Sequence, residues 1–118
     1  MKDILVVDDE NLFLADLAEY LGIHYGISNV ITAGNGKKAM EILNTAHFDL
    51  VVTDLAMPVM DGHALVKHMH EKYPKIPVLV MTSRDAADMG RGLQDLGVRK
   101  LFEKPLDFPG MARTILTM

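Results

Sequence analysis

The sequence predicts a doubly wound α/β domain built on a five-stranded parallel sheet. Five short apolar runs recur along its 118 residues, and most of them lack the alternation of a half-exposed strand. Continuous apolar runs rich in β-branched residues are typical of strands that are buried on both faces of a parallel sheet. Segments with helical periodicity separate the runs, and this alternation favours a layered α/β fold.

The strands and the first helix are the clearest elements. Leu14 and Leu21 bound a helical pattern of apolar residues at i, i+3, i+4 and i+7, and Gly22 is placed where a helix ends. The strands are expected at residues 4–7, 29–32, 48–52, 76–81 and 100–102.

The later helices are marked mainly by their ends. Asp61 can begin the third helix, and Asp107 before Phe108-Pro109 is a typical start for the last one. The fourth helix is expected over residues 85–96, with Gly97 as its C-terminal cap. Interior glycines at 90 and 92 would each destabilise that helix by about 1 kcal/mol relative to alanine, so we expect it to be loose.

The bulk composition limits the function classes. A length of 118 residues suits one domain, residues 1–118. The net charge is −4 and no basic cluster stands out, which argues against nucleic-acid binding by this domain. No apolar run approaches the roughly 20 residues that span a bilayer, so we expect no membrane contact. The absence of cysteine fits a cytoplasmic location.

Charged and polar residues follow the predicted strands. They are the pair Asp8-Asp9, then Asp54, Thr82 and Lys104. The carboxyl ends of parallel strands share one edge of the sheet, and there such folds bind their ligands. Clustered carboxylates repel one another, and a hard cation such as Mg²⁺ relieves that repulsion. A metal with a lysine can stabilise phosphoryl transfer, and a carboxylate can act as its nucleophile.

In this order and spacing, the residues resemble those of a response regulator receiver domain of the chemotaxis-regulator type. The resemblance covers all five strand–helix units. Its motifs are Asp8-Asp9, Asp54 within TDLAMPVMDG, Thr82, Lys104-Pro105 and the stretch TAGNGKKAMEIL at 32–43. It implies a flavodoxin-like (βα)₅ fold and a role in two-component or phosphorelay signalling.

The resemblance also implies a role for each residue of the site. Asp54 would accept a phosphoryl group from a phosphohistidine on a sensor histidine kinase or a histidine phosphotransfer protein. Thr82 and Lys104 would contact the phosphoryl oxygens. The Mg²⁺ ligands would be Asp8 (through water), Asp9, Asp54 and the backbone carbonyl of Ala56.

Three further expectations follow from the family. The Lys104-Pro105 peptide should be cis, to aim the lysine at the acceptor. The phosphoryl group should change the surface formed by the fourth helix, the fifth strand and the fifth helix, for an output domain or partner protein. The domain would therefore be a signalling switch rather than an enzyme.

Three positions depart from the family pattern. Leu101 stands where an aromatic residue is usual, so an aromatic readout on the fifth strand should be muted. Ala56 and Arg84 occupy positions that commonly tune dephosphorylation, and they leave the phosphoryl lifetime open. Two alternatives to the switch stay open: a pseudo-receiver that binds a partner without phosphorylation, and a small Mg²⁺-dependent phosphohydrolase.

Overall fold

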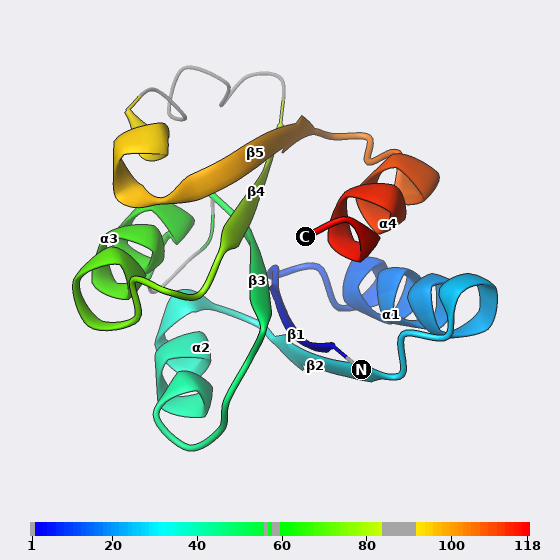
Figure 1. The fold of residues 1–118 in the computed structure, drawn as a ribbon, viewed down its shortest axis with the longest axis horizontal. Helices are drawn as coiled ribbons and strands as arrows, with labels where there is room; N and C mark the ends of the chain where they lie inside the picture. The colour runs from blue at the N-terminus through cyan, green and yellow to red at the C-terminus, as the bar shows by residue number, and fades with distance from the viewer. Residues whose placement is uncertain (1, 56, 58–59, 84–91) are drawn as a thin grey trace.

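A five-stranded parallel sheet forms the centre of the molecule, with helices on both faces (Figure 1). The computed structural model describes residues 2–55, 57, 60–83 and 92–118. The strand order is β2-β1-β3-β4-β5, so the winding direction reverses between β1 and β3. The elements are β1 (Asp3–Val7), α1 (Asn11–Tyr25), β2 (Asn29–Ala33), α2 (Gly36–Leu43), β3 (Leu50–Asp54), α3 (Gly62–Lys72), β4 (Val78–Thr82), the 3₁₀ helix η2 (Leu93–Leu96), β5 (Val98–Glu103) and α4 (Phe108–Leu116).

Two apolar layers hold the helices to the sheet. Successive strand residues point to opposite faces, so Ile4 packs towards α1 and α4 while Leu5 packs towards α2 and α3. Figure 1 shows these two helix pairs on opposite sides of the sheet. The predicted doubly wound α/β fold is thereby confirmed.

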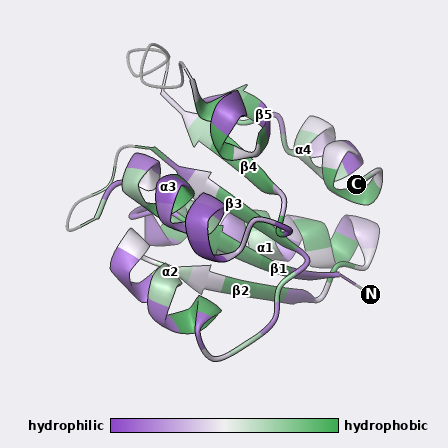
Figure 2. Ribbon diagram, turned by 60° about the vertical axis from the view of Figure 1, so that its left-hand side comes forward, coloured by the Kyte–Doolittle hydropathy of each residue, from purple (hydrophilic) through white to green (hydrophobic). Residues whose placement is uncertain are grey.

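The central strands are buried and the edge strands are not. Every residue of β3 and β4 is buried, whereas most residues of the edge strands β2 and β5 are exposed or half-buried. Figure 2 shows the hydrophobic residues concentrated on the strands. The continuous apolar runs of β1, β3 and β4 therefore correspond to strands covered on both faces, whereas the runs of the two edge strands do not.

Two predicted helix ends are correct. Asp61 caps α3, since its side chain accepts a hydrogen bond from the backbone N–H of Ala64 at 2.8 Å. Asp107 precedes α4, which has a proline in its first turn as predicted.

Two other predicted helix features are wrong. Helix α1 passes through Gly22 and ends at Gly26, whose φ of 67° gives the left-handed cap. Gly92 does not lie inside a helix, because its φ of 81° cannot continue a right-handed helix. Of the helix expected over 85–96, residues 85–91 lie outside the described residues, and Leu93–Leu96 form a 3₁₀ helix that Gly97 ends.

Candidate functional site

A lysine and two carboxylates meet at the carboxyl edge of the sheet. Asp8 follows β1, Asp54 ends β3 and Lys104 follows β5. The Lys104 Nζ atom lies 2.7 Å from Asp8 Oδ2 and 3.3 Å from Asp54 Oδ2. These three residues, far apart in sequence, thus form one charged centre. Their positions at the carboxyl ends of parallel strands had predicted this convergence.

Backbone hydrogen bonds anchor each of the three strand ends to a neighbouring strand of the sheet. The N–H of Lys104 donates to the carbonyl of Thr82 at 2.8 Å, and that of Asp8 donates to the carbonyl of Ala33 at 3.1 Å. The N–H of Leu55, just after Asp54, donates to a β4 carbonyl at 3.1 Å. The sheet therefore sets the positions from which the charged side chains reach each other.

Helix α3 begins in direct contact with the backbone of Asp54. The N–H of Gly62 donates to the carbonyl of Leu55 at 2.8 Å. A Cβ atom at residue 62 would lie 1.8 Å from the carbonyl oxygen of Asp54, far inside van der Waals contact. Glycine is therefore required here by the close approach of two backbones.

The charged centre is largely removed from water. Asp8 is 0% exposed and Asp54 is 6% exposed, while the Lys104 side chain is 18% exposed. Burial works against the charge of Lys104, but the hydrogen bond that its ammonium donates to Asp8 and the attraction of Asp54 and Asp8 outweigh it and raise the lysine pKa. The ammonium therefore remains charged between the two carboxylates.

Three consecutive acidic residues gather their carboxylates beside the charged centre. Carboxylate oxygens of Asp8, Asp9 and Glu10 lie within 4.8 Å of one another, and Asp9 and Glu10 are exposed. Such oxygens are the ligands that Mg²⁺ prefers, so the donor set fits that ion. Ala56, expected to add its backbone carbonyl, lies outside the described residues.

Thr82 ends β4 beside this centre and is completely buried. Its hydroxyl donates to the carbonyl of Ser83 at 3.2 Å. The Lys104-Pro105 peptide is cis, which confirms that prediction. Arg84 lies outside the described residues.

Sequence similarity agrees with this geometry. The family model for the response regulator receiver domain matches residues 4–115. The chain belongs to this family. The transcriptional regulatory protein ZraR of Escherichia coli K12 is 37% identical over 96% of this chain. The regulator of RpoS of the same strain is 35% identical over 89% of this chain.

The receiver domain spans only part of these relatives. The aligned segment is 25% of ZraR and 31% of the regulator of RpoS. Among solved structures, a response regulator receiver protein from Pseudomonas putida superposes with a TM-score of 0.91 over 100% of this chain and 98% of that one, at 22% identity. The chemotaxis response regulator CheY4 of Vibrio cholerae gives a TM-score of 0.86 over 99% and 98% at 24% identity, which supports the fold. Within the described residues, no helix has both the length and the apolar character that crossing a membrane requires.

Two residues near the charged centre of the receiver domain were missed from the sequence. Glu10 approaches Lys104 at 3.7 Å, and its place in the run Asp8–Glu10 could have suggested this. Phe13 places its ring 4.8 Å from the Lys104 Nζ atom. No motif marks Phe13, since its approach depends on how α1 crosses the sheet.

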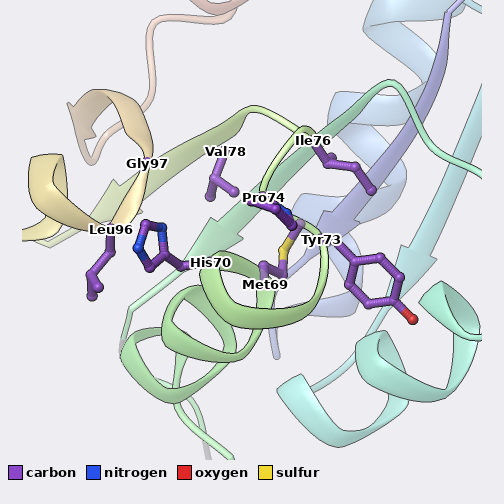
Figure 3. Close-up of a pocket in the computed structure, with 8 residues that line it drawn as sticks. All are labelled: Met69, His70, Tyr73, Pro74, Ile76, Val78, Leu96 and Gly97. Atoms are coloured by element: carbon purple, nitrogen blue, oxygen red, sulfur yellow. The ribbon is translucent and has the colours of Figure 1, made fainter.

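A small cavity at the other end of the sheet is a poor alternative site. It holds about 10 Å³ and is lined by the end of α3, the start of β4 and the turn before β5 (Figure 3). That volume suits about one water molecule. His70 borders the cavity, but Met69, Ile76 and Val78 make its walls mainly apolar.

Proposed function

We propose that this receiver domain is a phosphorylation switch that accepts a phosphoryl group on Asp54. The observation that carries the proposal is the Lys104 ammonium, held between Asp8 and Asp54 at the end of buried strands. A lysine in this place can stabilise the charge of a phosphoryl group arriving at Asp54. The donor would be a phosphohistidine on a sensor histidine kinase or a histidine phosphotransfer protein.

The chemical step is an exchange of one bond to phosphorus for another. A carboxylate oxygen of Asp54 attacks the phosphorus, and the bond from phosphorus to the histidine nitrogen breaks. The electron pair stays with the imidazole, which takes a proton from solvent, and an acyl phosphate remains on Asp54. Lys104 would follow the negative charge from the carboxylate to the phosphoryl oxygens, and the Thr82 hydroxyl would turn from the carbonyl of Ser83 to one of them.

Magnesium is proposed as the cofactor of this step. Bound Mg²⁺ would neutralise charge on the phosphoryl oxygens and the carboxylates. Asp9, Asp54 and the backbone carbonyl of Ala56 would hold it directly, and Asp8 through water. The exposed carboxylate of Glu10 joins this donor set.

The signal would leave the site through β4 and β5. Thr82 pairs with Glu103 in the sheet, so movement of Thr82 would pass to the strand that carries Leu101. The responding surface would be residues 85–96, β5 and α4, and it would act on an output domain or a partner protein. The cysteine-free sequence fits the cytoplasm as the place of this exchange.

Acetyl phosphate with Mg²⁺, followed by intact mass measurement, tests the proposal. We expect one phosphoryl group per chain, and none when EDTA removes the metal. An unmodified chain under all conditions would instead favour a binding module that works without phosphorylation. Sustained turnover of generic phosphoesters would favour a phosphohydrolase. The rate at which the phosphoryl adduct decays would give the lifetime of the acyl phosphate in a domain with alanine at position 56 and arginine at position 84.

A further inference from the structure

A series of ring contacts joins the two loops that carry the charged centre. Phe13 lies in the first turn of α1, just after the acidic run Asp8–Glu10, and Phe108 is the first residue of α4. Their rings meet edge to face, with centroids 5.9 Å apart. Phe108 also contacts the ring of Tyr20, at 5.4 Å. The Phe13 ring is therefore fixed by the packing of α1 against α4.

This fixed ring covers one side of the Lys104 ammonium. The Nζ atom lies 4.8 Å from the centroid of Phe13, within the range in which the negative face of a ring attracts a cation. Carboxylate oxygens of Asp8 and Asp54 receive its hydrogen bonds on another side. The four-carbon stem of a lysine is flexible, so the ring limits movement of the ammonium on the side that the two carboxylates leave open.

We infer that Phe13 is a positioning residue, which holds the Lys104 ammonium where it meets Asp54 and an incoming phosphoryl group. The inference rests on the proposed function, because the lysine needs this position only if phosphoryl transfer occurs at Asp54. The ring also excludes water from one side of the ammonium, and this strengthens its attraction to the carboxylates.

A second lysine–ring pair provides a matched control. Lys100 Nζ lies 4.9 Å from the centroid of Phe102, a half-buried ring of the same apolar layer as Phe13. Phe102 thus resembles Phe13 in burial and in its lysine contact, but its lysine is not part of the charged centre. A change that acts only through packing should affect the two positions alike.

The first test is the rate of phosphorylation by acetyl phosphate, a small donor that needs no docking surface. Phe13→Leu keeps apolar volume and loses the ring, and it should slow the reaction by about threefold or more, as expected for loss of one cation–π contact. Phe13→Tyr should restore the rate to within about twofold of the wild type, and Phe102→Leu should leave it unchanged. The inference would be overturned if Phe13→Leu were phosphorylated as fast as the wild type, or if Phe13→Tyr slowed phosphorylation as much as Phe13→Leu does.

The second test needs no phosphorylation. A ring over the ammonium displaces the NMR signals of the Lys104 Hε protons upfield, and Phe13→Leu should remove that displacement. Phe108→Leu, which removes the supporting ring, should reduce both the displacement and the rate by a smaller amount, and it serves if Phe13→Leu does not fold. If the wild type is not phosphorylated, the proposed function fails. The chemical shifts of the Lys104 Hε protons then decide by themselves whether Phe13 positions the ammonium. Unshifted Lys104 signals in the wild type would overturn the inference.

Discussion

The two ends of the parallel sheet contain different chemistry. At the carboxyl end, four polar side chains of the described residues are buried: Asp8, Thr53, Asp54 and Thr82. At the amino end, the small cavity is walled mainly by apolar side chains such as Met69 and Val78. Burying a polar group is unfavourable unless it finds partners, so a sheet built only for stability would not collect them at one edge. The contrast indicates that the carboxyl end, and not the amino end, holds the groups that chemistry at this sheet would need.

The strongest way to break this contrast is to remove the acceptor. Asp54→Asn should abolish phosphoryl incorporation from acetyl phosphate and Mg²⁺, because an amide oxygen cannot form the acyl phosphate. Intact mass measurement checks the loss, and circular dichroism should show an unchanged fold. Labelling of this variant at the wild-type stoichiometry would place the acceptor elsewhere.

Gly62→Ala should cause the largest loss of stability. Its Cβ would meet the carbonyl oxygen of Asp54 at 1.8 Å, and neither backbone can give way cheaply. We expect the free energy of unfolding to fall by about 3 kcal/mol, at the upper end for overpacked sites. Gly34→Ala is the matched control, since nothing lies within 4 Å of its Cβ position, and urea titration compares the two. Similar unfolding midpoints would contradict the close approach.

Lys104→Met should reduce stability in a pH-dependent way. The variant leaves Asp8 and Asp54 without their cation, at a cost of about 2 kcal/mol near neutral pH, less than for a fully buried pair because water reaches the lysine. The folded-state pKa of Lys104 is raised above its ordinary value of 10.5, since its bonds to Asp8 and Asp54 outweigh the effect of burial.

The sign of this pH effect follows from the raised pKa. The stabilisation by Lys104 is fully present below pH 10.5 and is lost as the pH rises through the higher folded-state value. Unfolding titrations from pH 8 to 11.5 should therefore show the wild type approaching Lys104→Met only at the alkaline end. A difference that stays constant throughout would argue against the ion pair.

At the opposite end of the sheet, Tyr73→Phe should alter stability alone. The Tyr73 hydroxyl donates to Asn44 Oδ1, which also accepts from Lys72 Nζ at 2.8 Å. Asn44 keeps one donor in the variant, so the loss should be about 0.5–1 kcal/mol. The rate of labelling by acetyl phosphate should not change, and a slower rate would mean that the two ends are coupled.

The sequence predicted most clearly the buried strands, which appear in it as continuous runs of apolar residues. The strands Leu50–Asp54 and Val78–Thr82 are covered on both faces, so their apolar residues follow one another without interruption. The convergence of Asp8, Asp54 and Lys104 was also predictable, because parallel strands end at one edge.

The end of α1 and the contact of Phe13 with Lys104 depend on three-dimensional geometry that sequence patterns alone do not reveal. Gly22 and Gly26 are both plausible helix ends, and only the backbone angle at Gly26 decides between them. The ring of Phe13 reaches Lys104 because α1 and α4 pack together on the same face of the sheet. Periodicity shows that Phe13 is apolar but not which side chain it faces.

The smallest effect on stability is expected for Leu101→Tyr, which tests how the signal leaves the carboxyl end. Leu101 lies on the edge strand β5 beside Val80 and is 36% exposed, so the larger side chain should change stability by no more than about 0.5 kcal/mol. Beryllofluoride, which mimics the phosphoryl group, should draw Thr82 towards Asp54 when it is added with Mg²⁺.

With leucine at 101, the side chain is too small to fill the space that this movement opens, so changes in amide hydrogen exchange over β5 and α4 should be small. The tyrosine variant should show larger changes in the same two segments, while Asp54→Asn should show none. Equal changes in Leu101→Tyr and the wild type would mean that β5 transmits the signal without an aromatic residue.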